Sequence, residues 1–252
     1  MTNSKALLIG INYKNSSCPL NGCVNDIHNI SDYLKTKNIQ NIECYTDESN
    51  YNDVTGYGIM RHLSKLALET WSQNLDLVWI HYSGHGCQVK DTNGDEVDGY
   101  DECICPVDYD KTGVIPDDYI RYYLNNMNPK TRVVCVFDCC HSGSIADLPY
   151  TYKSRSERTI ENRNPCASKI LVISGCLDPQ TSADAYGVGG KLEFTGALTS
   201  CLLEGLKKSN NVFDILDETR KILKSKGFSQ YPQITSSYDL SHDQLFIPQT
   251  QL

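Results

Sequence analysis

The feature that most constrains the fold of this chain is a set of short apolar runs, each followed by glycine-containing polar sequence. The run at residues 132–138 leads directly into Cys139-Cys140-His141-Ser142-Gly143, and the run at 77–80 leads into His81-Tyr-Ser-Gly-His85-Gly86. Both runs are rich in β-branched or aromatic residues, which is typical of central strands buried on both faces. They predict two strands that present a thiol and an imidazole at their carboxyl ends.

Segments with helical periodicity alternate with these runs, and this alternation predicts an α/β fold. We expect a mainly parallel, six-stranded central sheet with helices on both faces. The predicted strands are 5–11, 41–45, 77–82, 132–138, 169–174 and 244–247. The predicted helices are 22–37, 53–73, 116–125, 194–207 and 211–226, with Ile59, Leu63, Leu66 and Leu68 among the buried positions of the second.

Charge and hydropathy exclude several classes of protein. The chain carries 23 basic and 31 acidic residues, for a net charge of −8, which weighs against nucleic acid as a partner. It lacks a run of about 18 apolar residues, so we expect no membrane span. The N-terminal sequence has no signal-peptide pattern. We therefore expect a cytoplasmic protein, with the nucleus as the alternative.

The chain has twelve cysteines, and their positions favour reduced thiols. Cys135 falls in a predicted strand and Cys201 in a predicted helix, where a free cysteine behaves as a small apolar residue. The pairs Cys103-x-Cys105 and Cys139-Cys140 lack the repeated C-x₂₋₄-C spacing of a structural zinc site.

The strand and helix pattern stops between about residues 148 and 167. This stretch contains Lys153, Arg155, Arg158 and Arg163 but few apolar residues, so it is predicted to be an exposed linker. We expect one domain over residues 1–252. Its parts are a larger N-terminal part (1–148), the linker (149–167) and a smaller C-terminal part (168–252).

The predicted strand ends suggest the chemistry. In open parallel sheets, active sites form outside the carboxyl ends of the strands. A thiol is a good nucleophile only as thiolate, and a nearby imidazole can generate that form. Either Cys140 or His85 alone is more commonly a structural residue. Their occurrence at two strand ends, with glycines that allow close approach of a substrate backbone, favours a cysteine nucleophile and its base.

The motifs His81-Tyr-Ser-Gly-His85-Gly86 and Asp138-Cys-Cys140-His-Ser-Gly143 resemble the histidine and cysteine motifs of metacaspases, the caspase-like cysteine peptidases of clan CD. The resemblance covers nearly the whole chain and is closest to the type I subfamily. Two departures are the absence of a Pro/Gln-rich N-terminal prodomain and the presence of Cys139 where many members have serine. Further matching segments are 9–13, 20–26, 98–102, 180–184 and 231–233.

The resemblance implies a caspase-haemoglobinase fold, a monomeric state and a Cys-His dyad. Cys140 would be the nucleophile and His85 the base and leaving-group acid. Cys139 is the competing nucleophile. The backbone N–H groups of Gly86 and Cys140 would form the oxyanion hole. His141 is expected to be structural, and no third triad member is evident.

The resemblance also implies a substrate pocket lined by Asp26, Ser83 and Asp138. Strand alternation places Asp138 and Cys140 on one face, and Ser83 and His85 on one face. A pair of carboxylates suits arginine, which can bind bidentately, and also accepts lysine. The predicted cut is therefore after Arg or Lys. Asp26 could instead be a residue that caps the start of a helix.

An acidic stretch at 91–102 partly matches an EF-hand loop, but Glu96 replaces the required glycine and no second helix follows. The resemblance implies a different calcium site made by Asp101, Asp117, Asp118 and Asp147, with Asp98 as a substitute for Asp101. Calcium would then order a loop near the active site. The alternative is that these are solvated loop acids.

We therefore expect a calcium-dependent cysteine endopeptidase that cuts protein substrates after Arg or Lys through a thioester acyl-enzyme. The basic linker matches that specificity, so self-cleavage there is a further expectation. Two alternatives remain: a non-proteolytic scaffold or protein-quality-control factor with the same fold, and a calcium-responsive binding module.

Overall fold

The computed structural model describes residues 2–92, 94, 99–139, 145–161, 163, 166–175, 184–186, 194–240 and 245–246. Cys140, His141 and Asp98, which carry predictions made above, lie outside the described residues. The described residues form an α/β fold with a large central sheet, as the sequence predicts.

The central sheet has five parallel strands, extended at one edge by three antiparallel ones. Because the first five strands are parallel, their carboxyl ends lie at the same edge of the sheet. β3 and β7 are direct neighbours, and Ser83 pairs with Asp138 at their ends. The spatial order is β2 (Asn41–Thr46), β1 (Ser4–Gly10), β3 (Leu77–Ser83), β7 (Arg132–Asp138), β10 (Lys169–Ser174), β13 (Gln233–Ser236), β8 (Tyr150–Tyr152) and β9 (Arg158–Ile160).

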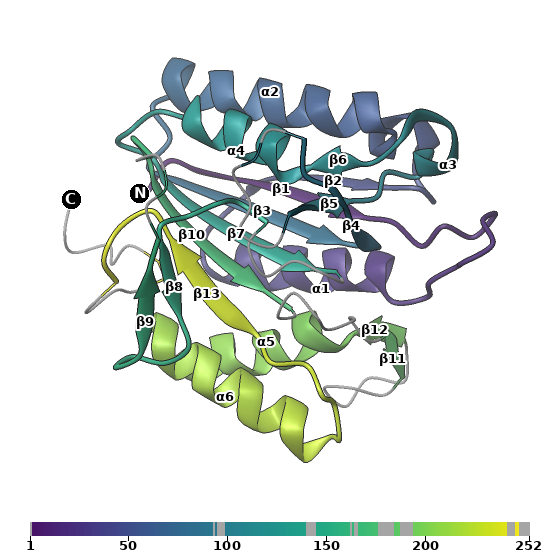
Figure 1. Cartoon of the computed structure of the whole chain (residues 1–252). Coiled ribbons are helices and arrows are strands. Elements are labelled where there is room, and N and C mark those ends of the chain that lie inside the picture. Colours follow the sequence, from purple (N-terminus) through teal and green to yellow (C-terminus); the bar gives the residue numbers. More distant parts are fainter. Residues whose placement is uncertain are drawn as a thin grey trace.

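Helices cover both faces of the sheet (Figure 1). On β7, Val133, Cys135 and Phe137 pack into one apolar core, whereas Val134 and Val136 pack into the other. This alternation explains why the central strands are apolar throughout. One face is covered by α2 (Gly56–Ser72) and α4 (Asp117–Asn125), and the other by α1 (Cys23–Thr36), α5 (Ala197–Lys208) and α6 (Val212–Ser225).

Short elements surround the carboxyl edge of the sheet. A small antiparallel sheet follows β3 directly, so that His85 lies between two strands of different sheets. Its strands are β4 (Gly86–Lys90), β5 (Tyr100–Ile104) and β6 (Ile115–Pro116). The remaining elements are η1 (Tyr51–Val54), α3 (Tyr109–Thr112), β11 (Asp184–Tyr186) and β12 (Phe194–Gly196).

Three sequence expectations were wrong in detail. The central sheet has eight strands among the described residues instead of six, and residues 245–246, expected in the sixth, are not part of a strand. The chain at 194–196 is a strand, so α5 begins later than expected. Leu68 is 69% exposed because it faces away from the sheet, unlike Ile59, Leu63 and Leu66.

The segment predicted as an exposed linker contains two strands. β8 pairs with β13, and β9 pairs with β8, so the segment adds two strands to the edge of the central sheet. Sequence reasoning missed these strands because each has only three residues and little apolar character. Its basic side chains form ion pairs with distant acids: Arg155 with Asp214, and Arg158 with Asp239.

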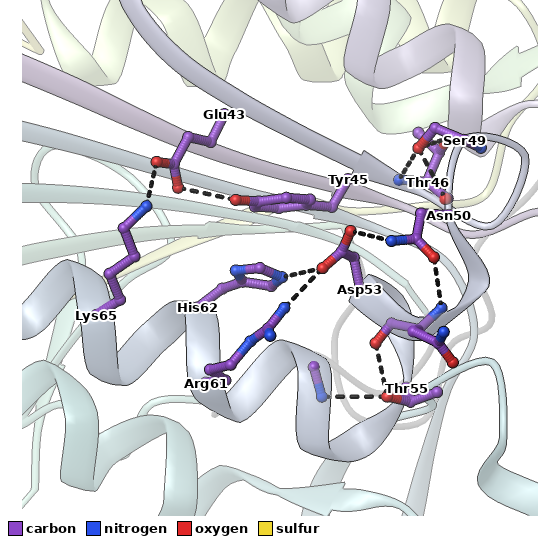
Figure 2. A network of polar contacts seen from close by, with 12 residues as sticks. Glu43, Tyr45, Thr46, Ser49, Asn50, Asp53, Thr55, Arg61, His62 and Lys65 are labelled. Atoms are coloured by element: carbon purple, nitrogen blue, oxygen red, sulfur yellow. Dashed lines mark hydrogen bonds and ion pairs between the residues drawn. The ribbon is translucent and has the colours of Figure 1, made fainter.

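A polar network fixes the segment that follows β2 (Figure 2). The ring of His62 on α2 stacks on Tyr45 with centroids 3.7 Å apart, and its Nε2 lies 3.1 Å from Asp53. Arg61 also donates to Asp53, at 2.8 Å. At the same end, Thr55 caps α2 by accepting a hydrogen bond from the Gly58 N–H group. The network therefore ties β2 and η1 to the first turns of α2.

Candidate active site

His85, the predicted base, lies two residues after the end of β3 and is held by the loop that follows β1. Its ring packs against Tyr13, with centroids 4.6 Å apart. Its backbone N–H donates to the Tyr13 hydroxyl at 3.0 Å, and its Nε2 lies 2.6 Å from the carbonyl oxygen of Cys18. Because β3 ends at Ser83, strand alternation cannot assign Ser83 and His85 to the same face. The His85 ring instead packs against Tyr13.

The contact with Cys18 determines which ring nitrogen of His85 carries a proton. A carbonyl oxygen can only accept a hydrogen bond, so Nε2 of the imidazole must be the donor. In the neutral ring, Nδ1 is then the nitrogen that can take up a proton. The orienting group is a backbone carbonyl, so no side-chain motif could have identified it in the sequence.

Of the two adjacent cysteines that follow β7, only Cys139 is among the described residues. Cys139 is fully buried in the apolar core on the α2 face, so its thiol is part of the packing. Cys140 lies outside the described residues. As predicted, Cys135 and Cys201 are also buried free thiols, and burial raises the pKa of each.

The three predicted pocket residues come together at the carboxyl edge of the sheet, on the face covered by α1 and α5. Asp26 on α1 and Asp138 at the end of β7 are both buried, as is Ser83. The Ser83 hydroxyl donates to Asp26 Oδ2 at 2.6 Å, and Ser83 pairs with Asp138 across the strands. Residues from three elements thus place two carboxylates side by side.

The start of α5 holds both carboxylates in place. The Gly196 N–H lies 2.8 and 3.0 Å from the two oxygens of Asp26. Thr199 donates to Asp138 Oδ2 from its N–H at 2.9 Å and from its hydroxyl at 2.8 Å. These N–H groups lack partners within the helix, and the helix dipole also favours anions here. Backbone N–H groups and one hydroxyl at the start of α5 therefore stabilise the two buried carboxylates.

Gly196 is required at the point where the two carboxylates meet. A Cβ atom at this position would lie 2.2 Å from Asp138 Oδ2 and 2.5 Å from Asp26 Oδ2. Neither Gly196 nor Thr199 was predicted as a site residue. A strand–helix junction with Gly-x-x-Thr is too common a pattern to identify them.

Asn12 resolves the alternative interpretation of Asp26 as a helix cap. Asn12 Oδ1 accepts hydrogen bonds from the N–H groups of Cys23 and Val24, at 3.1 and 3.4 Å. The first N–H groups of α1 are therefore capped by a residue from the loop after β1. Asp26 lies one turn further along and bonds to Ser83 and Gly196.

His81 extends this polar cluster into the interior. Its Nε2 lies 3.1 Å from the Thr199 hydroxyl, which itself donates to Asp138. The Thr199 hydroxyl therefore accepts a hydrogen bond from His81 Nε2, and the imidazole lies behind the pocket. Burial lowers the pKa of His81 to about 3.

The pKa of His81 predicts a pH dependence of stability. The unfolded histidine takes up a proton below its ordinary pKa of about 6.5, whereas the folded one does not until about pH 3. The contribution of His81 to the free energy of unfolding is therefore fully present above about pH 6.5. It falls by about 1.4 kcal/mol per pH unit as the pH drops below that value.

Urea unfolding at pH 7.5 and 5.5 measures this effect. His81→Gln keeps a donor for Thr199 but does not titrate, so it should lose roughly 1.4 kcal/mol less than the wild type between these pH values. His62, whose pKa is also lowered by burial, is common to both proteins. An identical pH dependence in the two proteins would contradict the assignment.

The four acids predicted to bind calcium lie on neighbouring segments. Pairing of β5 with β6 brings Asp101 close to Asp117, the first residue of α4. The Asp117 carboxylate accepts hydrogen bonds from the N–H groups of Glu102 and Asp118, at 3.1 and 2.9 Å. Asp101 and Asp117 are buried, whereas Asp118 is exposed.

Asp147 is paired with an arginine from the segment after β9. Arg163 Nη1 lies 2.5 Å from Asp147, and its Nε donates to Glu161 at 2.9 Å. The described residues contain no group of three or more His, Cys, Asp or Glu side chains arranged to hold a metal ion.

Comparison with known protein families matches residues 4–149 to the metacaspase, peptidase C14 domain. The chain belongs to the metacaspase family. Membership of this peptidase family implies cysteine-peptidase activity, and therefore protein or peptide substrates. Among its described residues, this metacaspase has no helix that is long and apolar enough to cross a membrane.

Relatives of this metacaspase align with almost its whole length. Metacaspase-2 of Trypanosoma brucei brucei is 39% identical, over 96% of this chain and 75% of that protein. Inactive metacaspase-4 of Trypanosoma brucei brucei is 33% identical, over 96% of this chain and 74% of that protein. A crystal structure of a Geobacter sulfurreducens protein matches with a TM-score of 0.66 and 23% identity over 93% of each chain, a likeness of fold alone.

Proposed function

We propose that this metacaspase is an endopeptidase that cuts after Arg or Lys, using Cys140 as nucleophile and His85 as base. The observation that carries this specificity is the convergence of Asp26 and Asp138 at the carboxyl edge of the sheet. A guanidinium placed between two carboxylates makes short, charge-assisted hydrogen bonds, and arginine can do so bidentately. An acidic side chain would be repelled from the same position.

The proposed reaction follows from the tautomer of His85. Nε2 is held by the Cys18 carbonyl, so Nδ1 takes the proton from the Cys140 thiol. The thiolate attacks the carbonyl carbon, and His85 returns the proton to the leaving amine as the peptide C–N bond breaks. Water, deprotonated by His85, then hydrolyses the thioester and releases the thiol. By family resemblance, the N–H groups of Gly86 and Cys140 stabilise the oxyanion.

The test is a set of peptide amides that differ only in the residue before the cut. Amides with Arg or Lys at this position should be hydrolysed, and the one with Asp should not. Turnover of the Asp amide at a comparable rate would overturn the proposed specificity.

A non-proteolytic scaffold is the second candidate, because the family includes a relative named as an inactive metacaspase. This chain retains Cys140, His85, Ser83 and Asp138. A protein that loses peptidase activity usually loses such residues first, so their presence favours the peptidase. Failure of every amide to react, with and without calcium, would leave the scaffold as the better proposal.

Calcium control is a separate proposal, supported by the family resemblance and by the proximity of Asp101 to Asp117. Asp147 can join these acids only if Arg163 leaves it. Self-cleavage in the segment 149–167 stays a prediction. Opening of the Arg155 and Arg158 ion pairs would have to precede cleavage at those residues.

Arg163→Ala should increase the affinity for calcium by about tenfold, because it removes a cation that competes for Asp147 in a partly buried position. Isothermal titration calorimetry on chains that also carry Cys140→Ala measures binding without self-cleavage. Arg155→Ala, which removes an arginine paired with Asp214, is the matched control and should leave the affinity unchanged.

Calcium binding with the same affinity in both variants would show that Arg163 does not compete with the metal. No measurable binding to any variant would remove the calcium proposal while leaving the peptidase proposal intact.

A further inference from the structure

A cavity of about 640 Å³ lies beside the candidate active site, and no role described above uses it. Its walls come from the loop after β1, the turn after β2, and the segment around α3. In Figure 1, α3 lies at the end of the sheet where β1 and β2 finish. Its lining includes Tyr13, Lys14, Asp47, Glu48, Tyr51 and Asp110.

The loop that forms one wall of this cavity also holds His85. Tyr13 lines the cavity and its ring packs against His85, with centroids 4.6 Å apart. Ser17 lines the cavity, and the carbonyl of the next residue, Cys18, bonds to His85 Nε2. The loop after β1 therefore lines the cavity and also contacts the His85 imidazole.

The cavity and the acidic pocket lie toward different faces of the central sheet. Asp26 and Asp138 face α1 and α5, on one face of the central sheet. Val107 and Tyr109, which line the cavity, pack instead against the core on the α2 face. An arginine side chain bound in the acidic pocket therefore does not occupy this cavity.

The order of the strands shows which part of a substrate reaches the cavity. The acyl carbon would bond to Cys140, which follows β7, and the leaving nitrogen would take its proton from His85, which follows β3. The direction from acyl carbon to leaving nitrogen therefore runs from β7 to β3. The next strand in that direction is β1, and its loop forms the wall of the cavity.

We infer that this cavity binds the peptide segment on the leaving-group side of the cut, the residues that follow the Arg or Lys. The inference rests on the proposed function, because it uses Cys140 and His85 in their proposed roles. It adds a second determinant of substrate choice, separate from the pocket for the residue before the cut.

The walls of the cavity are built before a substrate arrives. The Asp47 carboxylate accepts the backbone N–H groups of Asn12 and Tyr13, at 3.0 and 2.8 Å. Glu48 pairs with Lys14 at 2.6 Å and accepts from Asn12. The polar network in Figure 2 holds η1, which follows Glu48 in the chain, against α2. A preformed wall lowers the entropy cost of binding an extended peptide.

The lining selects against acidic peptides. Asp47, Glu48 and Asp110 oppose Lys14 and Lys111, which leaves an excess of one negative charge. Asp110 is exposed on α3, and Tyr51 is 46% exposed at the wall formed by η1. Tyrosine rings offer flat surfaces for side chains and cations. The segment after the cut should therefore carry Lys or Arg in preference to Glu or Asp.

The test uses substrates that share the acyl part ending in Arg and differ after it. One is an aminocoumarin amide with no peptide on the leaving side. Two are internally quenched peptides with four residues after the Arg, containing either lysines or glutamates. For the wild type, kcat/KM should be higher for the lysine peptide than for the glutamate peptide.

Two variants and a control test the cavity. Asp110→Lys should lower kcat/KM for the lysine peptide by about fivefold relative to the glutamate peptide, and Tyr51→Ala should lower kcat/KM for both by about fivefold. Neither change should alter the aminocoumarin amide by more than about twofold. Asp217→Lys reverses an exposed charge on α6, on the opposite side of the sheet, and should affect no substrate.

Two outcomes overturn the inference, and they are distinguishable from failure of the proposed function. If the amide is cut but Asp110→Lys and Tyr51→Ala leave both quenched peptides unchanged, the cavity does not bind the leaving side. The same holds if the variants change the amide as much as the peptides. If the wild type does not cut the amide, the proposed function itself fails, and the inference falls with it.

Discussion

Cys140→Ala should reduce the hydrolysis of Arg and Lys peptide amides by at least about 10³-fold, to a rate close to the uncatalysed background. No other group in the proposed mechanism can form the thioester, so the loss should appear in kcat and not in KM. Initial rates at saturating substrate, with the folded fraction checked by circular dichroism, measure it.

Cys139→Ala is the matched control, because it removes the adjacent thiol. Cys139 is fully buried in the core, so its loss should cost about 1 kcal/mol of folding stability and leave kcat within about twofold. Residual activity in Cys140→Ala together with inactivity in a folded Cys139→Ala would exchange the roles of the two thiols.

Asp138→Asn should lower kcat/KM for an Arg substrate by about 10²-fold or more, because a buried guanidinium would lose one of its two charge partners. The structure makes this substitution informative. Thr199 donates two hydrogen bonds to Asp138 Oδ2, and the amide oxygen of asparagine can still accept them. The variant thus removes the charge while it preserves the shape of the pocket.

A neutral substrate separates the loss of charge from general damage to the site. A peptide with citrulline, which is shaped like arginine but uncharged, should lose much less than the Arg peptide in Asp138→Asn. Glu69→Gln neutralises a partly buried acid that pairs with Lys5, away from the pocket, and should leave the Arg-to-citrulline ratio unchanged. An equal loss on both substrates in Asp138→Asn would show that Asp138 is structural.

The central part of the fold could be predicted from sequence because buried parallel strands require uninterrupted apolar runs. The strands β1, β3, β7 and β10 were each found from such a run, close to the observed bounds, whereas β2 is a partly exposed edge strand with a mixed sequence. The edge strands β8 and β9 were missed, since β9 pairs only with β8 among the described strands, and β8 joins the sheet through β13, more than 70 residues away. Three-residue strands at an edge carry no local signal of this kind.

The candidate site could be predicted only in part, for a similar reason. Side chains with distinctive chemistry, such as His85 and Asp138, stand out in their motifs. The groups that orient them do not: the Cys18 carbonyl, the Gly196 N–H and the Thr199 hydroxyl belong to residue types that occur everywhere in proteins. Only their position in space makes them part of the site.

The sequence by itself determined that this chain places a histidine at one strand end and cysteines at the next, with acids available nearby. The tertiary structure decided which acids lie close together and which donors or cations stabilise them. Asp26 and Asp138 converge because α5 directs its first N–H groups at both, whereas Asp147 is paired with Arg163. The physical reason is that a buried carboxylate needs donors or a cation, and those partners come from elements distant in the chain.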